Sequence, residues 1–226
     1  MFHRYAVYYT PEPGTPLAEF GADWLGWDSA TGAARTHPTM DGLDLPQITA
    51  TPRKYGFHGT IKPPFRLADG MSPEALKNAL AALCATASPV TLDGLHLARL
   101  GRFLALVPTG DASALAGLAA RVVKELDAFR APATDAELAK RRAARLSPAQ
   151  DAHLVQWGYP YVLDEFRFHL TLSGRLDPDL ATATEAALET PLSQLTLAPY
   201  RMTGLTLLGE DAAGMFHQIH RYALTG

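Results

Sequence analysis

The segment that decides the fold is YGFHGTIK, from Tyr55 to Lys62, and a shorter version of it, RFHLTL, runs from Arg167 to Leu172. Both segments read Phe-His-x-Thr-aliphatic. Each forms the first strand of the same expected order of elements, namely strand, helix, strand and strand. A repeated order of this kind predicts two halves related by a pseudo-twofold axis. The two motifs begin their repeats, so they are expected to face each other across that axis.

Within each motif, the polar residues alternate with apolar ones. In a β-strand, residues two apart point to the same side, so His58 and Thr60 share one face, about 6.6 Å apart along the strand. His169 and Thr171 share a face for the same reason. The apolar residues between them lie on the opposite face, which gives each strand a side for the core. Opposed across one cleft, the two strands are expected to hold two imidazoles and two hydroxyls.

Residues beside the motifs are candidate substrate contacts. Lys62 and Arg167 fall on the same strand faces, where they would add positive potential for an anion. Tyr55, Tyr159 and Tyr161 could stack a base or hydrogen-bond a phosphate, and aromatic core packing is the alternative. A predicted basic helix over 134–145 is either a solvated helical face or a patch that reaches a phosphate.

Turn residues, caps and periodicity predict the other elements. The expected strands are 4–9, 90–97, 103–107, 195–198, 202–208 and 214–222, and the expected helices are 16–27, 72–86, 111–129, 134–145 and 177–189. A long loop over 28–52 and an insertion over 134–161 are expected to cover the cleft.

Composition narrows the class of protein. The 226 residues carry 20 Lys and Arg against 23 Asp and Glu, and 47% are hydrophobic, which predicts a globular chain of one compact unit or two small lobes. With the repeated motif, we expect residues 1–226 to form a single domain with two pseudo-symmetric lobes. The net charge of -3 argues against long nucleic acid as a partner, because such binding needs a basic surface. The single cysteine, Cys84, excludes an internal disulfide and favours the cytoplasm. Neither a signal peptide nor a membrane span is expected.

Two histidines and two threonines around one cleft suit hydrolysis of a phosphodiester. Imidazole titrates near neutral pH, so one histidine can take a proton from water while the other gives one to the leaving oxygen. Each threonine hydroxyl can donate to a phosphoryl oxygen. The rate acceleration from two imidazoles and two hydroxyls is enough for hydrolysis of a strained cyclic phosphate, whereas hydrolysis of an unactivated monoester usually requires metal ions. We therefore expect neither a metal nor a cofactor.

The paired motifs resemble those of the two-histidine (2H) phosphoesterase superfamily. More narrowly, the strings RYAVYYTP, KYGFHGTIKPPF and WGYPYVLDEFRFHLTLSGRL resemble uncharacterised 2H proteins encoded in bacterial phosphonate-utilisation operons, and this resemblance spans nearly the whole chain. It implies a bilobal α+β fold with two antiparallel sheets around a central cleft and outer helices. It also implies a metal-independent phosphodiesterase in which His58, Thr60, His169 and Thr171 are catalytic. A small cyclic phosphate or a 2',5'-type phosphodiester would be the substrate, and a cyclic ribose phosphate or a nucleotide fits that description.

Other interpretations stay open. The two histidines could be hydrogen-bonded core residues, or the cleft could bind a nucleotide or an RNA end without turnover. A ligase or transferase could use the same residues in the reverse direction. Pseudo-symmetry makes the two histidines equivalent, so the assignment of base and acid depends on the orientation of the substrate.

Overall fold

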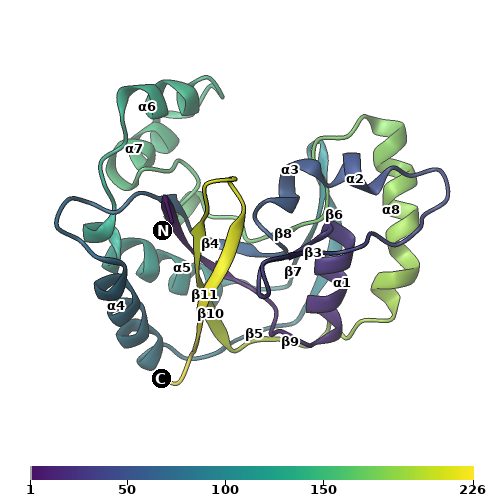
Figure 1. Cartoon of the computed structure of the whole chain (residues 1–226), viewed down its shortest axis with the longest axis horizontal. Helices are drawn as coiled ribbons and strands as arrows, with labels where there is room; N and C mark the ends of the chain where they lie inside the picture. The colour runs from purple at the N-terminus through teal and green to yellow at the C-terminus, as the bar shows by residue number, and fades with distance from the viewer. Residues whose placement is uncertain (1) are drawn as a thin grey trace.

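The framework of the protein is one seven-stranded antiparallel sheet, seen in a computed structural model that describes residues 2–226 (Figure 1). Its strand order is β11-β10-β1-β4-β8-β7-β6. The strands are β1 (Arg4–Tyr9), β4 (Gly59–Phe65), β6 (Gly94–Leu100), β7 (Phe103–Thr109), β8 (Leu170–Thr171), β10 (Gly204–Glu210) and β11 (Phe216–Ala223). Two short ribbons pair β2 (Trp27–Asp28) with β3 (Ala33–Ala34) and β5 (Val90–Leu92) with β9 (Tyr200–Met202).

The helices lie around this sheet, and the predicted α+β class is confirmed. They are α1 (Pro16–Leu25), α2 (Leu45–Ile48), α3 (Ala50–Arg53), α4 (Pro73–Ala85), α5 (Ser113–Glu125), α6 (Asp135–Arg142), α7 (Pro148–Trp157) and α8 (Pro178–Ser193), with 3-10 turns at Asp127–Phe129 and Leu163–Glu165. The predicted caps are present. Ser72 accepts a hydrogen bond from the backbone of Ala75, and Asp177 accepts one from Leu180.

The two expected sheets are joined into one at the centre. The join is the contact of β4 with β8, where Gly59 pairs with Leu170. The same order of elements follows each motif: β4, α4, β5 and the β6/β7 hairpin, then β8, α8, β9 and the β10/β11 hairpin. The strand predicted over 195–198 is wrong. Because α8 continues to Ser193, these residues form the turn before Pro199, which has no N–H for a strand ladder.

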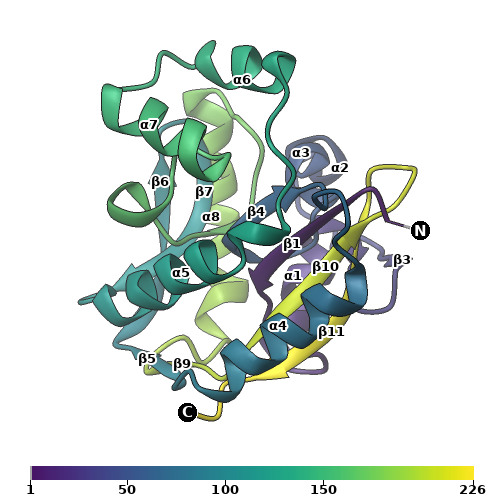
Figure 2. The ribbon, with the colours of Figure 1, turned by 90° about the vertical axis from the view of Figure 1, so that its left-hand side faces the viewer.

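The sheet has a large core on one face and a smaller cluster on the other. Val7 and Tyr9 of β1 belong to the main core, whereas Tyr8 packs with Leu208 and Phe216 in the smaller cluster. Helix α4 packs against β10 and β11, α5 packs against β4, and α8 packs against β7 (Figure 2). Because the large core covers one face of the sheet, a site can form on the other face, which carries Tyr8.

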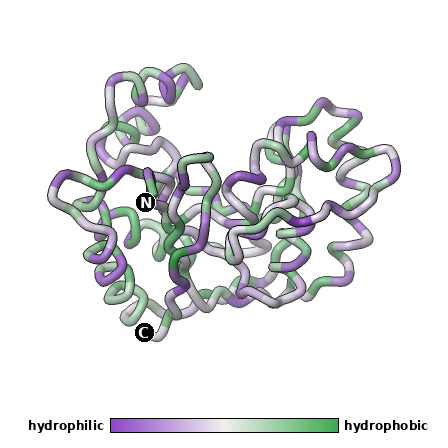
Figure 3. Tube along the Cα trace, viewed as in Figure 1, coloured by the Kyte–Doolittle hydropathy of each residue, from purple (hydrophilic) through white to green (hydrophobic). Residues whose placement is uncertain are grey.

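None of the helices within residues 2–226 has both the length and the apolar character needed to cross a membrane. Along the trace in Figure 3, the helices switch between hydrophobic and hydrophilic residues, as expected when one side of a helix packs on the sheet and the other side faces outward.

Candidate active site

The register of the central strands brings the two motifs together. Gly59 of β4 pairs with Leu170 of β8 in an antiparallel arrangement. One residue outward on each side, His58 is opposite Thr171 and Thr60 is opposite His169. All four side chains lie on the face opposite to that of Leu170, which is buried in the main core. Opposed residues of antiparallel strands have Cβ atoms about 4.5 to 5.5 Å apart, so the four groups form one compact set.

The apolar residues of the motifs fix this arrangement from the core side. Phe57 and Phe168 are both buried in the main core. The ring of Phe168 lies directly over Gly59, where an added Cβ would come within 2.3 Å of it. Glycine at this position therefore allows the two motif strands to approach each other.

Both imidazoles are held in the same tautomer. The Nδ1 of His58 is 2.9 Å from the carbonyl oxygen of Gly56, and the Nδ1 of His169 is 2.8 Å from that of Arg167. A carbonyl oxygen only accepts, so each Nδ1 carries the hydrogen and each Nε2 of the neutral ring keeps a lone pair. The Nε2 of His58 lies 3.2 Å from the Thr60 Oγ1. Gly56 has φ +71, a left-handed backbone that glycine adopts without strain and that helps to aim its carbonyl.

The two histidines differ in their electrostatic surroundings. Burial lowers the pKa of His58 to about 4, against a raising effect of the Gly56 hydrogen bond, and the nearby charge of His169 lowers it further. Burial also lowers the pKa of His169, and its hydrogen bond to Arg167 opposes this. Both rings are therefore neutral at pH 7 before an anion binds.

Aromatic rings hold the histidines in place. The ring of Tyr8 stacks on His58 with centroids 3.7 Å apart and an angle of 20°. Tyr55 lies 5.9 Å from the same histidine, and Phe103 lies 5.6 Å from His169. Tyr8 is buried, and burial raises the pKa of its hydroxyl well above the usual value, so this ring stays uncharged. A neutral aromatic face against His58 disfavours hydration of that imidazole.

A pocket of about 300 Å³, here called the His58 pocket, opens on this face. Three of the four polar motif residues line it, namely His58, Thr60 and Thr171. His169 is not among the residues that line it, and the centre of its ring lies 5.6 Å from that of Phe103, which does line the pocket. Thr51 and Pro52 of α3, at the end of the segment 28–52, also line it, and no other residue of that segment does.

Lys62 does not lie in the His58 pocket, and the prediction that it contacts substrate is wrong. Thr60 pairs with Tyr8, and Lys62 pairs with Val7. Between these two pairs β4 therefore contains one residue more than β1 does. This β-bulge turns Lys62 to the core face. Its side chain is 2% exposed, and its Nζ donates to the Val123 carbonyl at 3.1 Å and to Asp127 at 3.4 Å. Burial lowers its pKa to about 8.

The other predicted substrate contacts are divided between two places. Tyr55 lines the His58 pocket, and so does Tyr159. Tyr161 lies instead in a neighbouring pocket, edge-on to Tyr159 at 5.6 Å. Arg167 is exposed and donates to the carbonyls of Asp164 and Phe166, at 3.2 and 2.8 Å, rather than lining the His58 pocket. Because β8 begins only at Leu170, the strand alternation assumed for Arg167 does not extend back to it.

The sequence reasoning missed other residues of this pocket. Ser173 and Arg175 line it, and they continue the two-residue spacing of His169 and Thr171. Extending that spacing past the motif would have found both. Arg4 and Tyr8 also line the pocket, and they come from β1, which carries no motif of its own.

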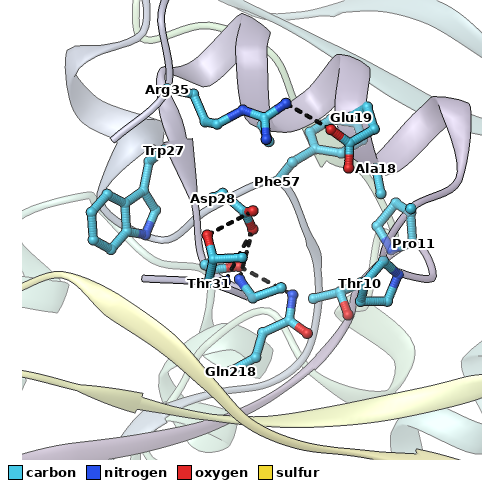
Figure 4. Close-up of a pocket in the computed structure, with 15 residues that line it drawn as sticks. Thr10, Pro11, Ala18, Glu19, Trp27, Asp28, Thr31, Arg35, Phe57 and Gln218 are labelled. Carbon is cyan, nitrogen blue, oxygen red and sulfur yellow. Dashed lines mark hydrogen bonds and ion pairs between the residues drawn. The ribbon is translucent and has the colours of Figure 1, made fainter. Parts of the chain in front are cut away.

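A separate hollow of about 220 Å³ lies between α1 and the β2/β3 ribbon (Figure 4). Its one lining cation, Arg35, is held by Glu19 at 2.6 Å and by Asp23 at 2.7 Å. The Asp28 carboxylate accepts from the Thr31 hydroxyl. The charged groups of this hollow therefore satisfy one another, and we place the candidate site at the His58 pocket instead.

Metal ligands do not gather at either place. Across the described part of the chain, no three His, Cys, Asp or Glu side chains lie close enough together to hold a metal ion.

Two curated proteins resemble this chain over most of its length. The chain is 38% identical over 218 residues to "Ribose 1,5-bisphosphate phosphokinase PhnN" of Janthinobacterium sp. (strain Marseille), covering 93% of this chain and 48% of that protein. It is 35% identical over 182 residues to a protein of the same name from Laribacter hongkongensis (strain HLHK9), covering 77% and 40% respectively. The chain thus spans about half the length, or less, of these curated relatives.

Solved structures match the chain at lower sequence identity. E. coli LigT complexed with 3'-AMP matches over 100% of both chains, with 15% identity and a TM-score of 0.47. A structure described as a phosphoesterase matches over 100% of both chains, with 18% identity and a TM-score of 0.46. Residues 60–217 match the family described as "Protein of unknown function (DUF1045)", which is most of the chain. The chain therefore belongs to the DUF1045 family.

Proposed function

We propose that this protein is a metal-independent phosphodiesterase that hydrolyses a small cyclic phosphate, or a 2',5'-type phosphodiester, in the His58 pocket. The observation that carries the proposal is the pairing of Gly59 with Leu170, which sets two imidazoles and two hydroxyls on one face of the sheet. The fixed Nδ1–H tautomers support it further, because each neutral ring keeps a lone pair on Nε2 for proton transfer. At His58 this lone pair faces the Thr60 hydroxyl until the substrate draws that hydroxyl to a phosphoryl oxygen.

The different surroundings of the histidines suggest different roles. His58 has the more strongly lowered pKa and stays neutral, so its Nε2 takes a proton from water as the water oxygen bonds to phosphorus. The bond from phosphorus to the leaving oxygen breaks, and protonated His169 gives that oxygen a proton. Thr60 and Thr171 donate hydrogen bonds to the phosphoryl oxygens, where charge increases. Exchange of one proton with solvent at each histidine then restores the starting state.

The names of the curated relatives favour a ribose phosphate as substrate. Those relatives are called ribose 1,5-bisphosphate phosphokinases, and this chain matches about half of each. A P-loop kinase requires a Gly-Lys pair in its phosphate-binding loop, and this chain contains no such dipeptide. We therefore assign phosphodiester hydrolysis of a ribose-based phosphate, in phosphonate metabolism, to this chain and do not assign it the kinase reaction. Its cytoplasmic location stays a prediction.

Turnover of a defined panel tests the proposal. Nucleoside 2',3'-cyclic phosphates, a base-free ribose cyclic phosphate and a 2',5'-linked dinucleotide are incubated with the protein, with and without EDTA. We expect a phosphomonoester as product, at a rate that EDTA does not change. Binding without product after prolonged incubation would favour the binding module. Joining of a cyclic phosphate end to a free hydroxyl would favour the ligase.

The pH dependence of kcat/KM is expected to be bell-shaped, with its maximum in mildly acidic solution. The base must be neutral, so activity falls as the pH drops towards the His58 pKa of about 4. The acid must be protonated, so activity falls as the pH rises through the pKa of His169, which lies below the usual imidazole value of about 6.5. Initial rates at low substrate concentration from pH 3.5 to 9 measure both limbs.

The same experiment at saturating substrate provides a comparison. A bound phosphate anion raises the pKa of both imidazoles, so the limbs of kcat are expected at higher pH than those of kcat/KM. A kcat/KM that keeps rising through pH 8 would contradict the roles given to the two histidines.

A further inference from the structure

A second pocket, of about 530 Å³, adjoins the His58 pocket below α6 and α7 and is here called the basic pocket. Four residues line both pockets, namely Arg4, Tyr55, Pro64 and Arg141. The two pockets therefore share a wall. A small molecule that occupied both pockets would have its reacting phosphate beside His58 and its other end beside α6.

The basic pocket concentrates positive charge in a chain whose net charge is -3. Its lining includes one acidic residue, Glu137, and six basic ones: Arg4, Lys54, Arg66, Arg130, Lys140 and Arg141. A local excess of this kind raises the concentration of anions in a cleft.

Half of these cations already have carboxylate partners. Arg4 pairs with Glu210, Arg66 with Glu137, and Arg130 with Asp127. Within residues 2–226, Lys54, Lys140 and Arg141 make no ion pair. The Lys54 ammonium lies 4.8 Å from the centre of the Tyr55 ring, and the Arg141 guanidinium lies 4.8 Å from that of Tyr159. These aromatic contacts position the two cations beside the shared wall without neutralising them.

The basic residues in the last turn of α6 have two different kinds of neighbour: some line the basic pocket, and one pairs with a residue of α7. The helix begins with a capping box formed by Thr134 and Glu137. At its other end, Arg142 pairs with Asp151 at 2.7 Å and does not line the pocket. Lys140 and Arg141, the two residues before it, do line it. The basic cluster is thus neither wholly a solvated face nor wholly a binding patch, and Arg142 is a matched control for Lys140.

We propose that the basic pocket binds a second phosphate of the substrate, so that the substrate is a cyclic phosphodiester that also carries a phosphate monoester. This proposal rests on the proposed function, because the first phosphate is the one hydrolysed beside His58. A monoester carries close to two negative charges, which matches a site with several cations that lack carboxylate partners. A neutral sugar or base could accept hydrogen bonds from these cations but would leave their charges unpaired. Long nucleic acid would need a continuous basic track, which the overall charge disfavours.

Matched pairs of substrates test the second-phosphate site. Adenosine 2',3'-cyclic phosphate is compared with its 5'-phosphorylated form, and a ribose cyclic phosphate is compared with and without a second phosphate. The readout is the ratio of kcat/KM within each pair. We expect the second phosphate to raise kcat/KM by about 10- to 100-fold, mainly by lowering KM, because it is bound equally in the ground state and the transition state. Lys140→Ala is expected to lower this ratio about tenfold, whereas Arg142→Ala leaves it unchanged.

The outcomes separate this proposal from the proposed function. Equal kcat/KM within each pair, or equal ratios in wild type and Lys140→Ala, overturns the second-phosphate site while hydrolysis itself stands. Failure to hydrolyse any cyclic phosphate overturns the proposed function. In that case calorimetric titration with inorganic pyrophosphate tests the anion site directly: an affinity reduced by Lys140→Ala but not by Arg142→Ala supports it, and an affinity that neither changes overturns it.

Discussion

Replacing either motif histidine by alanine, in His58→Ala or His169→Ala, is expected to lower kcat for a cyclic phosphate by about 10²- to 10⁴-fold. The first variant removes the Nε2 that accepts a proton from water, and the second removes the group that protonates the leaving oxygen. Neither role can pass to another histidine, because the register of β4 with β8 supplies only these two at the centre of the sheet. Single-turnover rates with excess enzyme measure the chemical step apart from product release.

A matched control comes from elsewhere in the same sheet. His96 is an exposed histidine on β6 that contacts Thr109, and His96→Ala is expected to keep full activity. The two motif histidines act on one reaction, so the double variant is expected to lose less than the product of the single losses. Full activity in either motif variant, with an unchanged circular dichroism spectrum, would remove that histidine from the mechanism.

Much of the fold could be predicted because its signals are local. The helix that Ser72 caps and the helix that Asp177 caps begin where a cap followed by proline predicts. The strand Arg4–Tyr9 was evident from its aromatic and β-branched residues. The strand expected over 195–198 failed because nothing in the sequence shows that α8 continues past the predicted end at 189.

The site was predictable only where its residues follow one period. Duplication of the motif indicated that two separated segments form a common site, and the pairing of Gly59 with Leu170 agrees with that expectation. Lys62 was misplaced because a β-bulge depends on how β1 pairs with β4, which is a property of two strands and not of one. Arg141 reaches the same pocket from α6, far along the chain, and only the folded structure reveals that proximity.

Removing a motif hydroxyl, in Thr60→Ala or Thr171→Ala, is expected to lower kcat by about 10²- to 10³-fold and to change KM little. The two hydroxyls line the His58 pocket from opposite strands, so they can donate to different phosphoryl oxygens. Such a donor helps most where negative charge builds up, which is why the loss should appear in kcat. The Thr60 Oγ1 also lies 3.2 Å from the His58 Nε2, so Thr60→Ala is expected to alter the pH profile as well.

The serine variants separate chemistry from packing. Thr60→Ser and Thr171→Ser keep the hydroxyl but lose the methyl group, so each is expected to keep activity within about tenfold of wild type, whereas Thr60→Val and Thr171→Val keep the shape and lose the donor. A valine variant as active as its serine counterpart would mean that the hydroxyl donates nothing to the transition state. A loss that falls equally on serine and valine variants would assign the threonine methyl group a packing role. If only the valine variants lose activity, the reaction depends on the hydrogen that each threonine hydroxyl donates. The polar residues of the two motifs are then explained by catalysis on one face of the sheet, and the apolar residues between them by packing on the other face.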